Sequence, residues 1–181
     1  NDASTQVDLL SPYSVDKYSM ELYAEMANKA YGLSSIGLRL FNVYGPRQDP
    51  SSPYSGVISI FIDRLKNDRE VQVNGGYQTR DFVYVNDVVN IIEKSIILAK
   101  LQPICERVNV LTGKTCTVNE LLNILTIILK KVPNIDQRIL PNGDPERSDG
   151  TTDKMCHLFG IDVNKMNSLH LGLKKTIIAQ N

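Results

Sequence analysis

The sequence predicts an α/β fold, in which strands and helices alternate along most of the chain. Segments with apolar residues at helical spacing recur throughout, and short runs rich in branched and aromatic residues lie between them. The chain has 181 residues, of which 42% are hydrophobic and 22% are charged. It is therefore long enough to bury a sizeable core as one globular unit.

The first half of the chain is expected to begin with a helix and to continue into a long loop. Residues 1–11 are polar and irregular, whereas Tyr13–Tyr31 has helical spacing, with Pro12 near its start and Gly32 just after its end. Long ordered loops usually bind something. The elements expected next are a strand at Ser35–Asn42, a loop at Val43–Ser55, a helix at Gly56–Asn67, a strand at Val71–Asn74 and a turn at Gly75–Gly76.

The second half repeats the alternation of strand and helix. Asn86 and Asp87 carry side-chain oxygens that can cap a helix, which places the helix start at Val88. The expected elements are a strand at Arg80–Val85, a helix at Val88–Lys100, a strand at Arg107–Leu111, a helix at Val118–Lys131, a loop at Pro141–Asp144, and short helices at Asp153–Phe159 and Lys165–Ala179.

Composition excludes several classes of protein. Twenty basic and twenty acidic residues give a formal net charge of zero, which argues against a nucleic-acid surface. The three cysteines lack the close pairing of a zinc site, so we expect reduced, mostly buried thiols and no metal. The longest apolar runs, such as Leu121–Leu129, are far too short to span a membrane, and a cytoplasmic location is the default expectation.

Tyr13 and Lys17 form the first candidate catalytic pair. Residues four apart lie on one face of a helix, where the ammonium can favour the phenolate and make Tyr13 a general base. A Tyr-x-x-x-Lys spacing alone is weak evidence, since a surface helix pair has the same pattern. Three segments follow it in order: Gly37–Arg47 (GLRLFNVYGPR), Gln78–Val85 (QTRDFVYV) and Gly143–Ser148 (GDPERS).

With these segments, the chain resembles the extended short-chain dehydrogenase/reductase superfamily, and within it the NAD-dependent nucleotide-sugar epimerases and dehydratases. The UDP-glucose and UDP-N-acetylglucosamine 4-epimerases are the most similar subgroup. The resemblance implies an incomplete, Rossmann-like doubly wound parallel sheet, of which only the C-terminal part is present, and a smaller α/β substrate-binding lobe. Residues 1–45 would belong to the dinucleotide-binding domain and residues 46–181 mainly to the substrate lobe, with 80–101 packing back on the sheet.

The resemblance also implies roles for individual residues. Tyr13 would take a proton from a sugar hydroxyl while a hydride passes to NAD, and Lys17 would hydrogen-bond the nicotinamide ribose. Phe41 would lie against the nicotinamide, although ordinary strand core explains it equally well. Sugar-nucleotide substrate would contact the residues Asn42, Val57, Asn74, Arg80 and Arg147, with Arg47 either on substrate or bracing its loop against Asp49.

Guanidinium groups suit the diphosphate because they donate two parallel charged hydrogen bonds, so Arg80 and Arg147 are the expected clamps; solvated surface charge is the alternative. For Asn74, a turn asparagine is the simpler explanation. The resemblance further implies a homodimer formed through the Tyr13 helix.

The family's glycine-rich turn, acidic ribose-binding residue and catalytic Ser/Thr would all precede Asn1. We therefore expect the chain to be the C-terminal portion of a 4-epimerase, inactive alone. The alternatives are a non-catalytic nucleotide-sugar-binding or interaction module, and part of a 4,6-dehydratase.

Overall fold

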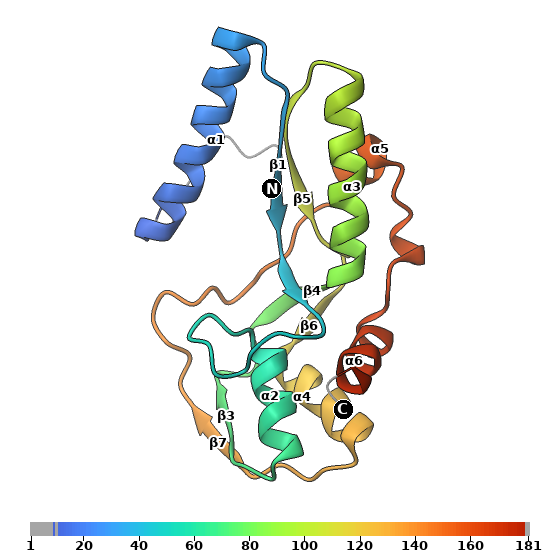
Figure 1. The fold of residues 1–181 in the computed structure, drawn as a ribbon. Coiled ribbons are helices and arrows are strands. Elements are labelled where there is room, and N and C mark those ends of the chain that lie inside the picture. The colour runs from blue at the N-terminus through green and yellow to red at the C-terminus, as the bar shows by residue number, and fades with distance from the viewer. Residues whose placement is uncertain (1–8, 10, 180–181) are drawn as a thin grey trace.

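The computed structural model describes Leu9 and residues 11–179, which form the expected α/β fold (Figure 1). The irregular start expected over residues 1–11 lies mostly outside the described residues. The helices are α1 (Pro12–Tyr31), α2 (Val57–Lys66), α3 (Val85–Leu101), α4 (Val118–Leu129), α5 (Asp153–Phe159), the 3₁₀ turn η1 (Val163–Lys165) and α6 (Leu169–Ile178). The strands are β1 (Ser35–Leu40), β2 (Asn42–Tyr44), β3 (Val71–Asn74), β4 (Thr79–Tyr84), β5 (Cys105–Val110), β6 (Thr115–Thr117) and β7 (Ile135–Arg138).

Strand pairing among the described residues is mostly parallel. β1 pairs with β5, β2 with β4, and β3 with β7, all in parallel, while β6 runs antiparallel to β4. Only Phe41 separates β1 from β2, so one extended stretch of chain changes its partner from β5 to β4 at this residue. This change of partner connects the upper and lower regions in Figure 1.

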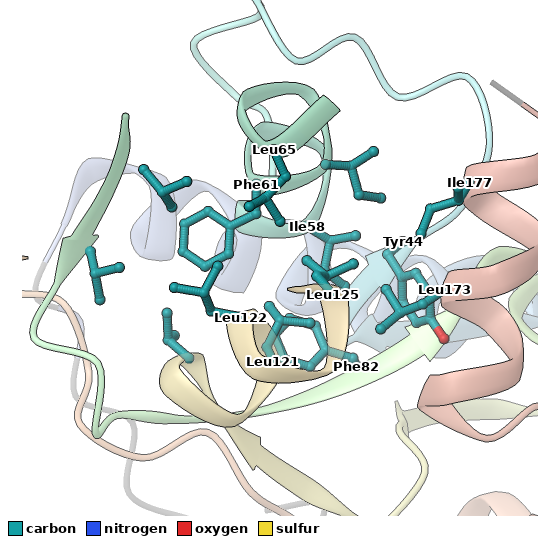
Figure 2. Close-up of a cluster of buried hydrophobic side chains, with 14 of the residues drawn as sticks. Tyr44, Ile58, Phe61, Leu65, Phe82, Leu121, Leu122, Leu125, Leu173 and Ile177 are labelled. Carbon is teal, nitrogen blue, oxygen red and sulfur yellow. The ribbon is translucent and has the colours of Figure 1, made fainter. Parts of the chain in front are cut away.

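The lower region has its own hydrophobic core, which joins α2, α4 and α6 to β2, β3 and β4 (Figure 2). Helix α2 buries one face because its apolar residues recur three or four positions apart. Ile58, Phe61 and Leu65 from α2 meet Leu121 and Leu125 from α4. All five side chains are 2% exposed or less, so this region is packed like a domain interior.

A second core lies in the upper region, where α3 and α5 pack on the β1–β5 sheet. This core includes Val88 and Ile91 from α3, Val108 from β5 and Met155 from α5. Helix α3 thus packs on β1, and α5 packs on β5 beside α3. Helix α1 lies on the opposite side of β1 from α3 (Figure 1).

Three short strands were not expected from the sequence. Val43 and Tyr44 belong to β2, although their stretch was assigned to a loop, and β6 and β7 were not expected at all. Each of these strands has only three or four residues. Such segments are too short to show alternation, and their pairing partners lie far away in sequence.

Two helices begin three or more residues away from their expected first residue. Helix α3 starts at Val85, so Asn86 and Asp87 lie in its first turn and do not cap it; Asp87 instead accepts from the main-chain and side-chain nitrogens of Asn167, both at 2.9 Å. Helix α6 starts four residues later than expected, because the Ser168 side chain accepts from the Leu171 N–H and caps the helix there.

Candidate functional site

The local sequence at the start of α1 explains where Tyr13 and Lys17 lie. Ser11 caps the helix, with its hydroxyl accepting from the Ser14 N–H at 3.1 Å, and Pro12 occupies the first turn. Tyr13 is 71% exposed. The Lys17 ammonium lies 5.4 Å from the centre of the Tyr13 ring, as helical spacing predicts. The pair is therefore assembled and accessible.

Tyr13 and Lys17 line a cavity of about 590 Å³ between α1 and the β1–β5 sheet. Met20, Glu21 and Ala24 continue the wall along the helix. The opposite wall includes all of β1 and the first three residues of β5. The cavity thus separates the face of α1 that carries the Tyr-Lys pair from the sheet.

A second cavity, of about 420 Å³, lies in the lower region and gathers four of the expected substrate-binding residues. Asn42, Val57, Asn74 and Arg80 all line it. They come from β2, α2, β3 and β4, so only tertiary folding brings them together. Since β1 lines the first cavity as far as Leu40 and Asn42 lines the second, the two cavities lie on either side of Phe41 along the chain.

The Gly75–Gly76 turn sets the position of Asn74. Both glycines have positive φ, 70° and 102°, and a Cβ at Gly76 would collide with the Asn119 side chain, so a larger residue is excluded. The buried Gln78 side chain braces this turn, accepting from the Gly76 N–H at 2.6 Å and donating to the Asn74 carbonyl at 2.7 Å. The asparagine at the turn is thereby held at the cavity wall.

Arg80 is held firmly at the edge of this cavity. Its side chain is only 12% exposed, which rules out the alternative of a solvated surface charge. One terminal nitrogen donates to the carbonyls of Thr79 and Pro145, and the other donates to the Asp144 carboxylate at 2.5 Å. The guanidinium is therefore oriented before any ligand arrives.

The other predicted site residues lie outside the lining of both cavities. Phe41, between β1 and β2, is half-buried and packs against the upper core. Arg147 has a side chain that is 80% exposed, with Asp149 at 3.8 Å, although its backbone bridges Thr79. Arg47 is exposed, with φ of 68°.

Among the residues that the structure describes, no ion pair joins Arg47 to Asp49. The Asp49 carboxylate accepts from the Ser51 main-chain N–H at 2.8 Å and from the Ser51 hydroxyl at 2.7 Å. These bonds within the loop lower the pKa of Asp49 below its usual value. Aspartate side chains often accept from the main-chain N–H two residues later in this way, which closes a local turn.

Asp81, next to Arg80, is fully buried and fixes the neighbouring loop. One carboxylate oxygen accepts from the Thr112 N–H and from its hydroxyl, both at 2.9 Å. Burial raises the pKa of Asp81, and the hydrogen bonds from Thr112 only partly oppose this effect. The Asp81 carbonyl also accepts from the Asn42 side chain at 3.2 Å, so β4 positions a cavity residue through its main chain.

Sequence reasoning missed five polar residues of the lower cavity: Ser55, Arg64, Gln72, Gln78 and Asp144. Gln78 and Asp144 lie inside the segments on which the resemblance rests. These segments were quoted from the sequence, but neither residue was assigned to the site. Gln72 lies two residues before Asn74, on the same side of the strand, and its side chain donates to the Asn74 side-chain oxygen at 2.9 Å. That alternation could have identified it.

The cysteines differ from expectation in burial. All three are free, as expected, but each is half-buried and not mostly buried. Burial and the nearby Glu120 carboxylate raise the pKa of Cys116 to about 11, so its thiol stays protonated near neutral pH. Within the described residues, no cluster of histidine, cysteine and acidic side chains could hold a metal ion. No helix in this part of the chain has the length and apolarity needed to cross a membrane.

Comparison with known proteins identifies relatives that are similar to this chain in sequence and in fold. A protein of Methanocaldococcus jannaschii, provisionally named a UDP-glucose 4-epimerase, is 46% identical over 125 residues, which are 68% of this chain and 39% of the relative. The crystal structure of UDP-glucose 4-epimerase from Thermotoga maritima with UDP-glucose matches with a TM-score of 0.83 and 33% identity, over 98% of this chain and 59% of that one.

A third relative is the UDP-N-acetylglucosamine 4-epimerase from Methanobrevibacter ruminantium, in complex with UDP-N-acetylmuramic acid. It matches with a TM-score of 0.85 and 32% identity, over 98% of this chain and 56% of that one. The present chain thus spans little more than half the length of these solved structures. Residues 1–109 match the model of the NAD dependent epimerase/dehydratase family. Parallel α/β topology, the assembled Tyr-Lys pair and this match lead to one conclusion: the chain belongs to the NAD-dependent epimerase/dehydratase family.

Proposed function

We propose that this chain is part of an NAD-dependent 4-epimerase of UDP-glucose and UDP-galactose or of their N-acetylated analogues. The observation that carries the proposal is the lower cavity, where Asn42, Val57, Asn74 and Arg80 converge from four elements. Tyr13 and Lys17 line the neighbouring cavity along the same stretch of chain. A nucleotide sugar would place its nucleotide in the lower cavity and its sugar toward Tyr13.

The polar groups of the lower cavity suit a nucleoside diphosphate. Arg80 has its guanidinium preoriented by two main-chain carbonyls, and charged hydrogen bonds from such a group favour phosphate oxygens. The Asn42 side chain would meet the diphosphate beside it. Val57 and Asn74 would lie at the nucleotide end, and the exposed Arg47 and Arg147 would reach the substrate from their loops.

The residues present fit one end of NAD. Tyr13 and Lys17 offer a hydroxyl and an ammonium on one accessible helix face, which suits the nicotinamide ribose, and Phe41 would approach the nicotinamide through its backbone. When bound, NAD supplies the chemistry of accepting a hydride from the sugar and returning it. Residues 1–45 would accordingly serve the dinucleotide side and residues 46–181 mainly the nucleotide sugar.

Tyr13 would act as the general base of the reaction. Its phenolic oxygen would take the proton of the sugar 4-hydroxyl as that carbon is oxidised to a ketone, and would give the proton back after the keto-sugar has turned over. Lys17 would stabilise the phenolate through its positive charge. Arg80 would retain the nucleotide diphosphate throughout, so that the sugar can rotate without leaving the protein.

The remaining proposals concern the setting of the site. We place the enzyme in the cytoplasm and its dimer contact along α1, which exposes Met20, Leu22, Tyr23 and Met26. We also propose that the isolated 181-residue chain does not turn over substrate. A Tyr13→Phe variant of a longer protein containing this segment should lose turnover and keep nucleotide-sugar binding, whereas full activity would exclude Tyr13 as the base.

Calorimetry with UDP tests the lower cavity directly. Arg80→Ala should weaken UDP binding about tenfold or more, because a charged hydrogen-bonding group is removed from the phosphates. Arg69→Ala is the matched control, since Arg69 is exposed, pairs with Asp63 and lies outside the cavity lining. Equal UDP affinity in the wild type and Arg80→Ala would contradict the proposed substrate site.

The rival function is a nucleotide-sugar-binding module without catalysis. It rests on the lower cavity alone, where Asn42, Val57, Asn74 and Arg80 could bind a nucleotide sugar without the Tyr-Lys pair. Binding of UDP-sugar without measurable NAD binding would support this module, whereas NAD binding by these residues alone would argue against it. A 4,6-dehydratase remains the other alternative, to be distinguished by the sugar product of a longer protein.

A further inference from the structure

We infer that Glu21 is a positioning residue, which fixes the helix carrying Tyr13 and Lys17 to the sheet through its ion pair with Arg39. The importance of this fixation for catalysis rests on the proposed function. The attachment of α1 to the sheet is independent of the proposed function, since it is a property of the described residues alone.

Helix α1 does not bury any side chain against the rest of the fold. None of its residues is buried, although it is 20 residues long. Several of its large apolar side chains are instead exposed, among them Met20, Leu22, Tyr23 and Met26. A cavity separates part of its inner face from the sheet. Burial of apolar area, which normally holds a helix on a sheet, is therefore weak here.

Ion pairs connect α1 to both strands of the upper sheet. Arg39 of β1 donates to the two carboxylate oxygens of Glu21 at 2.7 and 2.8 Å, in the two-pronged geometry that favours this pairing. Arg107 of β5 donates to Glu25 at 2.7 Å and lies 3.6 Å from Glu21. Since Gly37 pairs with Arg107, Arg39 and Arg107 lie on the same face of the sheet.

Glu21 is the most buried member of this group. Its side chain is 16% exposed, against 33% for Arg39 and 36% for Arg107. The hydrogen bonds from Arg39 are the largest cause that lowers the pKa of Glu21, with further lowering from the charges of Arg39 and Arg107. The carboxylate is thus charged and directed between two strands, whereas the Lys29–Glu25 pair stays within the helix surface.

Glu21 also lies on the same face of α1 as the proposed catalytic pair. Tyr13, Lys17 and Glu21 are four residues apart in turn, and all three line the same cavity. Eight residues of helix span about 12 Å, so a rotation or tilt at Glu21 is carried rigidly to Tyr13. An anchor on this face fixes both the height and the rotation of the phenol over β1.

Hydrogen exchange of the 181-residue chain, resolved by residue, tests the attachment. In Glu21→Gln, amides of α1 should exchange roughly tenfold or more faster, because charged hydrogen bonds to Arg39 are lost. Amides of α4 should be unaffected. Asp16→Asn is the matched control, since Asp16 is exposed on the same helix and forms no ion pair with another described residue. Exchange in Glu21→Gln no faster than in Asp16→Asn would overturn the inference.

A charge reversal distinguishes loss of the Glu21–Arg39 ion pair from a general effect of the substitutions on the stability of α1. Glu21→Arg and Arg39→Glu should each release α1, and the double variant should restore much of its protection. Failure of this rescue, or the absence of protection in the unmodified chain, would also overturn the inference. UDP binding in Glu21→Gln should equal that of the wild type. If neither the wild type nor any variant bound UDP, the proposed substrate site would be contradicted, whereas the hydrogen-exchange result would still hold.

Discussion

Helices α1 and α4 start in the same way but are held in the fold in different ways. Each has a capping box, built from Ser11 and Ser14 in α1 and from Thr117 and Glu120 in α4. Helix α4 buries four apolar residues in the lower core, whereas α1 buries none. Local helix signals therefore say nothing about how strongly a helix is fixed.

This difference divides the candidate site by its physical support. The lower cavity is built on α2, β3 and β4, which share the densely packed core (Figure 2). The Tyr-Lys pair lies on a helix held mainly by charged side chains. We expect the nucleotide end of the site to keep its shape under conditions in which the catalytic helix moves.

The largest expected effect concerns the lower core. Leu125→Ala should lower the free energy of unfolding by about 3 kcal/mol, because a fully buried side chain is replaced by a cavity. Ile127→Ala on the same helix should cost no more than about 0.5 kcal/mol, since Ile127 is 66% exposed. Denaturant unfolding measures both. Equal losses would show that α4 is not fixed by its buried face.

Acid should release α1 before it affects the lower region. The pKa of Glu21 is held below its usual value of 4.5, so its attachment is complete above that pH and is lost as the pH falls through the lowered value. Asp81 behaves in the opposite way, because its raised pKa makes its contribution larger as the pH falls. Hydrogen exchange between pH 3 and pH 6, corrected for intrinsic rates, should show the loss in α1 first; parallel loss in α1 and α4 would contradict the comparison.

The smallest expected effect comes from the two helix caps. Thr117→Ala should lower the free energy of unfolding of the lower region by about 1 kcal/mol, since α4 is part of its core. Ser11→Ala removes a similar bond, with the hydroxyl 3.1 Å from its partner nitrogen in each case. It should increase exchange in the first turn of α1 and leave the denaturation midpoint unchanged. A matching fall in both midpoints would show that α1 folds together with the core.

Sequence reasoning located the candidate site better than it described it. Asn42, Val57, Asn74 and Arg80 were selected from short segments, and the structure brings all four to one cavity. The expected importance of Arg147 was based on similar reasoning, yet its side chain is exposed beside Asp149. A side-chain direction in a long loop depends on neighbours far along the chain, which a segment cannot reveal.

Local patterns in the chain were enough to predict most helices and strands, the helix face shared by Tyr13 and Lys17, and the turn at Gly75–Gly76. These features follow from spacing and backbone sterics within a few residues. Folding in three dimensions was needed to establish the partners of the short strands, the convergence of residues on the lower cavity, and the attachment of α1 through Glu21 and Arg39. Each of these depends on contacts between residues distant in sequence, whose free energy is gained only when the chain has folded.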